Sequence, residues 1–188
     1  MADPGAILDR SSEYPGEEFT NEDFEAVQDA IHGGRLGDVV DRPSALVLGS
    51  YDDAERQRLD EVRAGLDDHI EAVIMDEVLE VWTYWTSKFK LLVANSDLVV
   101  GVYEHSDGGH EWEAGYLDAR PHREQTVVLR RNYPDVDAPE DEPFDAMLAH
   151  WIETMRYVDS VYDWTLEADD APSLDDAVGA VVANHVDF

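Results

Sequence analysis

Short runs of apolar residues alternate along the chain with longer segments whose apolar positions recur every three or four residues. The runs occupy 45–48, 72–75, 98–103 and 126–129. Four to six apolar residues with almost no polar alternation are typical of parallel strands that are covered on both faces. The pattern therefore predicts four buried strands after Pro43.

The segments between these runs have the spacing of amphipathic helices. Asp53 follows the first run, and Leu59, Val62 and Leu66 then fall on one stripe of a helix. Similar stripes predict five helices in all, at about 52–66, 82–95, 110–120, 144–155 and 174–182. A fifth strand is expected between 156 and 166.

The alternation of strands and helices predicts an α/β fold with a doubly wound, parallel, five-stranded sheet of flavodoxin-like type. We expect this domain to span 44–188, preceded over 1–43 by a flexible lead-in with a short helix near Phe24, Val27 and Ile31. In such sheets ligands bind beyond the carboxyl ends of the strands. That edge is expected to carry the candidate binding residues Gly49, Ser50, Tyr51, Asp76, Gly108, Gly109 and His110.

The amino-acid composition indicates which partners and surroundings suit the protein. The chain has 44 Asp and Glu against 13 Lys and Arg, a net charge of -31. This excess of acid argues against nucleic-acid and anionic-membrane partners, which need a basic surface. There is no cysteine, no basic and apolar leader at the start, and no apolar run long enough to span a membrane. We therefore expect a cytoplasmic protein of a salt-rich cell.

The surface charge carries a first testable prediction. Self-repulsion of this size destabilises a compact chain in dilute buffer, whereas molar salt reduces the Debye length to about 3 Å and screens it. We expect ellipticity to fall on dialysis from molar KCl into dilute buffer. Equal melting temperatures in the two solutions, measured by circular dichroism, would contradict the prediction.

The loop after the third strand holds the candidate chemistry. Asp107, Gly108 and Gly109 let the backbone pass close to a ligand and present N–H groups at the start of a helix. We expect Glu113 in the first turn of that helix, ionised because the helix dipole favours its charge, and Gly115 where the helix approaches its neighbours. Such a carboxylate could attack or stabilise the cationic carbon formed when an N-glycosidic bond breaks. It could equally be an ordinary helix stabiliser, and the residue types leave both possibilities open.

Other residues allow more than one interpretation. Histidines and acids on the same loop could ligate a metal, but they are common on the loops of acidic proteins, and we expect no metal and no cofactor; they are His105, Asp107, His110 and Glu111. Arg130 and Arg131 could hold a phosphate or form ion pairs. Tryptophans could stack on a base or belong to the core: Trp82, Trp85 and Trp112.

Two motifs resemble those of the nucleoside 2-deoxyribosyltransferase family and its relatives in the TIR-like superfamily. The first is the turn Leu48-Gly49-Ser50-Tyr51, and the second is Asp107-Gly108 followed, at a six-residue step, by Glu113-Ala114-Gly115. The resemblance covers about 45–130. The chain departs from the family in two places, with no acid near 85–88 to hold a base and with Val47 where the family often has Tyr.

The resemblance implies that Glu113 is the nucleophile that opens the glycosidic bond. It implies that Asp107 holds the sugar or assists proton transfer. The expected substrate is a nucleoside, a nucleotide or an NAD-like compound, and the expected assembly is a homo-oligomer. The alternatives are a non-catalytic TIR-like module that binds nucleotides in signalling or defence, and a scaffold that uses only its surfaces.

Overall fold

The computed structural model contains the predicted parallel sheet. Its described residues are 25, 42–78, 85–134, 136, 143–166 and 171–186. The predicted lead-in and short helix over 1–43 lie outside them, apart from Glu25, Arg42 and Pro43. The five strands are β1 (Ser44–Gly49), β2 (Glu71–Ile74), β3 (Leu98–Tyr103), β4 (Thr126–Arg131) and β5 (Val161–Trp164).

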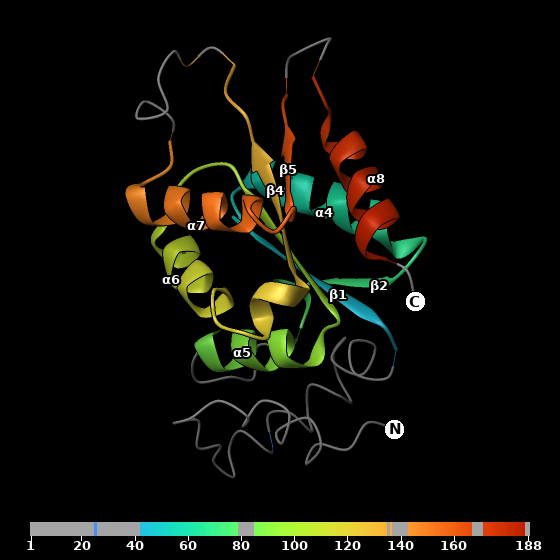
Figure 1. The fold of residues 1–188 in the computed structure, drawn as a ribbon. Coiled ribbons are helices and arrows are strands. Elements are labelled where there is room, and N and C mark those ends of the chain that lie inside the picture. Colours follow the sequence, from blue (N-terminus) through green and yellow to red (C-terminus); the bar gives the residue numbers. More distant parts are fainter. Residues whose placement is uncertain are drawn as a thin grey trace.

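All neighbouring strands pair in parallel, in the order β2-β1-β3-β4-β5 (Figure 1). This is the flavodoxin-like order, so the predicted fold class is confirmed. The fifth strand lies at 161–164, within the interval that the sequence predicted.

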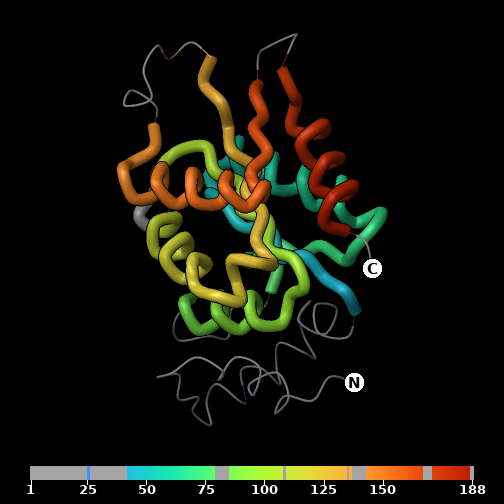
Figure 2. The backbone as a smooth tube through the Cα atoms, in the orientation of Figure 1, coloured from blue at the N-terminus to red at the C-terminus, as the bar shows by residue number. Residues whose placement is uncertain are grey.

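Helices cover both faces of the sheet. They are α4 (Asp53–Asp67), α5 (Trp85–Asn95), α6 (Gly108–Leu117), α7 (Ala146–Arg156) and α8 (Leu174–His185), with short 3-10 helices η1 (Met75–Glu77) and η2 (His122–Gln125). The helices α4 and α8 pack on one face and α5, α6 and α7 on the other (Figures 1 and 2). Among the described residues, no helix is long and apolar enough to cross a membrane.

The uninterrupted apolar strands follow from this double cover. In β1, Ala45 and Val47 belong to the core under α4 and α8, whereas Leu46 and Leu48 belong to the core under α5, α6 and α7. Successive side chains of a strand point to opposite faces, so a sheet buried on both faces needs apolar residues at every position.

Two helix starts differ from the predicted bounds because an aspartate caps each of them. Asp107 accepts a hydrogen bond from the Gly109 amide, and α6 therefore begins at Gly108. Asp145 accepts from the amides of Met147 and Leu148, and α7 begins at Ala146. A side chain that satisfies free amides sets the first helical residue more sharply than apolar spacing does.

The order of the strands creates a crevice between β1 and β3. These strands are neighbours, with Gly49 opposite Val102, and the helices that follow them lie on opposite faces of the sheet. A Cβ added to Gly49 would lie 2.8 Å from the Val102 carbonyl oxygen and 2.8 Å from Leu59 Cδ2. The glycine therefore lets the chain leave β1 tightly against β3 and brings the two loops together.

Candidate functional site

The crevice between β1 and β3 holds a pocket of about 200 Å³. Five of the seven candidate binding residues line it, together with both candidate catalytic acids and two further residues, Met75 and Trp85. The lining residues are Gly49, Ser50, Tyr51, Met75, Trp85, Asp107, Gly109, His110 and Glu113. The two sequence motifs thus meet at one site, although they are more than fifty positions apart in the chain.

Glu113 is the buried acid of the pocket. Its exposed fraction is 7%, and its Oε2 atom has no hydrogen-bond partner among the described residues. Burial, and secondarily the negative charge of Asp107, raise the pKa of Glu113 to about 8. The carboxyl is therefore mostly protonated at neutral pH in the free protein, and the expectation that the helix dipole keeps it ionised is wrong.

The position of Glu113 on the helix explains this error. It lies in the second turn of α6, and the acid of the first turn is Glu111. The stabilising effect of the helix dipole fades beyond the first turn, whereas the desolvation of a buried carboxyl acts in full.

Tyr103 is a second buried polar group close to Glu113. Its side chain is fully buried at the end of β3, and its hydroxyl has no hydrogen-bond partner among the described residues. Burial, followed by the charge of Glu113, raises the pKa of Tyr103 well above its ordinary value. A Cβ added to Gly101 would collide with the Tyr103 ring, so this glycine provides the space for it. Two interacting buried groups that each lack a partner are typical of a site that awaits a ligand.

Asp107 and His110 form the rim of the pocket. Asp107 is exposed and caps α6. It therefore has the structural role of stabilising the start of the helix, in addition to any role toward a ligand. His110 is buried, and its Nδ1 lies 3.0 Å from the His105 carbonyl oxygen. This contact makes Nδ1 the protonated nitrogen and leaves Nε2 able to accept a hydrogen bond when the ring is neutral.

A charged network adjoins the pocket on the side of α4. His105 Nε2 lies 3.0 Å from Glu55 Oε1, and His105 Nδ1 lies 3.0 Å from the Ser106 carbonyl oxygen. Because both ring nitrogens face acceptors, the imidazole satisfies both only as a cation. The hydrogen bond to Ser106, and then the charge of Glu55, raise the pKa of His105. Burial opposes a low pKa at Glu55, but a hydrogen bond from Ser50 and the charge of His105 lower it.

Glu104 holds together the loops beyond this network. Its buried carboxylate forms ion pairs with Arg58 of α4 and, at 3.1 Å, with Arg131 of β4. The Tyr133 hydroxyl donates to the Glu104 backbone carbonyl. Arg131 also lies over the Tyr133 ring. The arrangement fixes the carboxyl end of β3, from which the loop to α6 departs.

We expect Glu104→Gln to lower the free energy of unfolding by about 3 kcal/mol, because it leaves two neighbouring arginines without their shared anion. Urea unfolding in molar KCl measures the change. Glu153→Gln is the matched control, since Glu153 pairs with Arg156 but its side chain is 62% exposed. A loss at Glu104 no larger than at Glu153 would show that the triad contributes nothing measurable.

Asp76 does not belong to the pocket, contrary to the prediction from the sequence. It lies in η1, and its carboxylate pairs with Arg56 of α4 at 3.1 Å. Its neighbour Met75 lines the pocket instead. The 3-10 turn after β2 directs successive side chains differently from a strand, so the last residue of the apolar run, Met75, reaches the crevice and Asp76 does not.

The structure also shows the surroundings of the two arginines and of the glycines that the sequence singled out. Arg130 pairs with Asp163 and Arg131 with Glu104, each at 3.1 Å, which agrees with the ion-pair interpretation of these arginines. A Cβ added to Gly115 would meet no atom within 4 Å, so the expected close approach at this glycine is wrong. Gly108 is the first residue of α6.

Two aromatic side chains lie at the pocket mouth: Tyr51, which the sequence named as a binding candidate, and Trp85, which it left open between a base-stacking role and the core. Trp85 is 45% exposed and Tyr51 is 41% exposed, and both line the pocket. The Trp85 ring packs edge-on against Trp112, with 4.9 Å between ring centroids. Trp82 lies outside the described residues. The signal in the sequence was a Trp near the start of a predicted helix that follows the carboxyl end of the second strand.

The described part of the chain contains no group of three or more His, Asp or Glu side chains arranged to hold a metal ion. No curated protein and no solved structure matches the chain. The sequence profile of DUF8170, a family of unknown function, matches residues 35–173, and the chain therefore belongs to this family.

Proposed function

We propose that the protein cleaves or transfers at the N-glycosidic bond of a nucleoside, a nucleotide or an NAD-like compound. In the first step the ionised carboxylate of Glu113 attacks the anomeric carbon, the bond to the base breaks, and its electron pair stays on the base nitrogen. Asp107 holds the sugar or assists the transfer of a proton to the departing base. Water or a second base then attacks the glycosyl ester and releases Glu113.

The observation that carries this proposal is the buried Glu113 carboxyl in the pocket. It has an oxygen without a partner among the described residues, in a pocket formed by the two motifs that resemble those of the deoxyribosyltransferases. A buried acid with a strongly raised pKa, in a cleft at the switch point of a doubly wound sheet, is typical of a functional site.

The walls of the pocket support a base and sugar as the bound part of the substrate. Tyr51 and Trp85 offer exposed aromatic rings on which a base can stack. Among the described residues that line the pocket there is no Lys or Arg, and the two acids are Asp107 and Glu113. Any phosphate of the substrate is therefore expected to lie outside this pocket, because the carboxylate of Asp107, and that of Glu113 when it is ionised, would repel it.

The test is release of free base, measured by chromatography in molar KCl over a panel of ribonucleosides, deoxyribonucleosides, their monophosphates and NAD. Turnover of at least one compound is the expected result. If no compound is turned over, the catalytic proposal fails.

A non-catalytic nucleotide-binding module is the second candidate function. The observation that favours it is the pKa of Glu113 near 8, since a protonated carboxyl is a hydrogen-bond donor and a poor nucleophile. The two functions differ in what co-purifies. Mass spectrometry of the denatured protein should detect an intact nucleotide if the pocket only binds, and it should detect free base or no ligand if the pocket turns over.

The same pKa sets the expected pH profile of catalysis. About a tenth of Glu113 is ionised at pH 7 if its pKa is near 8. Base release should therefore rise about tenfold per unit below pH 8 and level off above it. Asp107→Asn removes a charge that raises this pKa, and it should move the rise to lower pH whatever it does to the maximal rate. A profile that is flat from pH 6 to 9 would exclude Glu113 as the ionising group.

We further propose that the protein acts in the cytoplasm on a small molecule and assembles as a homo-oligomer. The assembly is expected because related transferases complete their sites across subunits. Light scattering in molar KCl measures it, and a monomer mass at all concentrations would refute it.

A further inference from the structure

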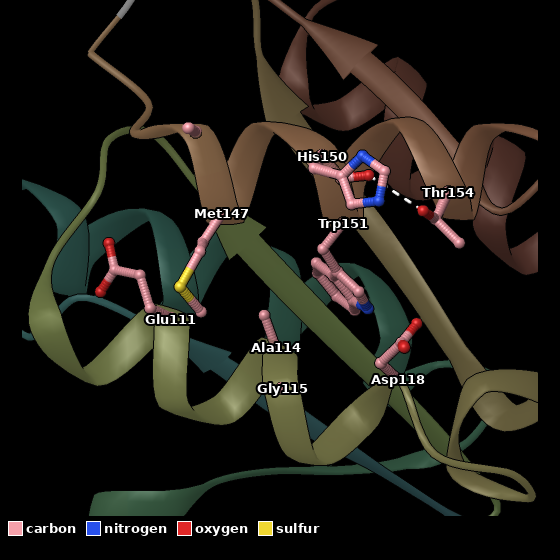
Figure 3. Close-up of a pocket in the computed structure, with 9 residues that line it drawn as sticks. Glu111, Ala114, Gly115, Asp118, Met147, His150, Trp151 and Thr154 are labelled. Atoms are coloured by element: carbon pink, nitrogen blue, oxygen red, sulfur yellow. Dashed lines mark hydrogen bonds between the residues drawn. The ribbon is translucent and has the colours of Figure 1, made fainter.

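We propose that the groove between α6 and α7 is a second small-molecule site, which takes a flat heteroaromatic ring without negative charge. The groove encloses about 350 Å³, more than the pocket around Glu113. It lies on the other side of α6 from that pocket. Ala114 and Gly115 line it from α6, Asp118 from the end of that helix, and Met147 and Trp151 from α7 (Figure 3).

The shape of the groove suits a flat ring. Figure 3 shows the Trp151 indole descending from α7 toward α6, with Ala114 and Gly115 facing it. Gly115 contributes no side chain, and a Cβ placed there would meet no atom within 4 Å. Met147, 65% exposed, stands at the opening. A planar molecule can therefore lie over the glycine backbone, with its edge at the small part of the indole that stays exposed.

The indole N–H of Trp151 indicates that the bound ring has a hydrogen-bond acceptor. Trp151 is only 5% exposed, and its Nε1 has no acceptor among the described residues. The nitrogen is directed toward the end of the groove where Asp118 lies (Figure 3). A buried donor without an acceptor is unfavourable, so a ligand with a ring nitrogen or carbonyl oxygen gains by accepting from it. Because Nε1 is closed to water, the proposed binding includes a small rotation of the indole.

Charge restricts the ligand further. The described residues that line the groove include no Lys or Arg, and acidic side chains lie at both of its ends, Glu111 and Asp118. The carboxyl group of Glu111 interacts with that of Asp145, and Asp118 pairs with Arg123 at 2.7 Å. On a chain with a net charge of -31, an anionic ring would be repelled where a neutral ring is not.

The test uses adenine and nicotinamide as neutral rings and nicotinate as the anionic counterpart of nicotinamide. Protein labelled with ¹⁵N at tryptophan gives one indole N–H signal per Trp, and Trp151→Phe identifies the signal of Trp151. In molar KCl, at least one neutral ring should shift this signal saturably, while nicotinate at the same concentrations leaves it in place.

Two substitutions examine space and charge separately. Gly115→Leu fills the groove and should weaken binding at least tenfold. Gly179→Leu is its matched control on α8, because a Cβ at Gly179 also meets no atom within 4 Å. Met147→Lys adds a cation at the exposed opening and should make nicotinate bind.

Several results would overturn the proposal: no shift with either neutral ring, equal shifts in wild type and Gly115→Leu, or binding of nicotinate to the wild type. A fall in oligomer mass in Gly115→Leu, without any ligand-induced shift in the wild type, would show instead that a second copy of the chain occupies the groove. Base release from nucleosides is a separate measurement, so failure of this site leaves the proposed function untouched.

Discussion

Glu113→Gln is expected to abolish base release in molar KCl, with a loss of several orders of magnitude. Glutamine keeps the shape of the protonated carboxyl, but it cannot ionise and cannot form the ester with the anomeric carbon. The fold should survive the change, because the wild-type side chain is already mostly neutral at pH 7. The loss should persist at pH 9, where the wild type is fastest.

The control for this variant is Glu111→Gln on the same helix. Glu111 lies two residues before Glu113, and its carboxyl is directed to Asp145 of α7 and not to the pocket of Glu113. Base release by Glu111→Gln should stay within about twofold of the wild type. Turnover that survives in Glu113→Gln would show that another group is the nucleophile.

The second large effect is on stability, and it does not depend on catalysis. The folded-state pKa of Glu113 is raised to about 8 from an ordinary value of 4.5. Between these values the unfolded chain has released the proton and the folded chain has kept it. The free energy of unfolding therefore falls as pH rises through this window, by on the order of 4 kcal/mol in total, and is constant for this group above pH 8.

Glu113→Gln removes this contribution, since glutamine does not titrate. Wild type and variant should be similarly stable near pH 5, and the variant should be the more stable protein by a few kcal/mol at pH 9. Urea unfolding of both proteins at pH 5, 7 and 9 in molar KCl measures the difference and cancels the titration of all other groups. Glu153→Gln, at an exposed site, should show no change of this kind. A Glu113→Gln difference that is the same at all three pH values would mean that Glu113 is ionised when folded.

The effect of Glu113 on stability also bears on function. A group that destabilises the folded protein above neutral pH is unfavourable unless a ligand compensates it. A substrate that develops positive charge at the anomeric carbon would do so, because a nearby cation lowers the pKa of a carboxyl. The pH dependence of stability and the loss of base release in Glu113→Gln therefore both depend on the buried carboxyl of Glu113. The first is measured without ligand and the second during turnover.

Much of the fold could be predicted from the sequence because its determinants are local. Runs such as 98–103 have no polar position that could face water, so both faces of the strand must be covered. Parallel strands joined by helices then leave few orders, of which the observed one is the default. The meeting of Gly49 with the loop of Asp107 follows from that order, because neighbouring parallel strands end at the same edge.

The charge states and directions of the side chains were decided only by the tertiary structure. Whether Glu113 is ionised depends on how many apolar atoms surround it, and these come from distant segments such as Tyr103 at the end of β3. Asp76 is directed to Arg56 because a 3-10 turn follows β2, and Trp85 of α5 lines the pocket with 45% of its surface exposed. The space between α6 and α7 depends on how two helices pack. Local patterns determined which segments form strands and helices, whereas burial and electrostatics sum over the whole fold and could be known only from it.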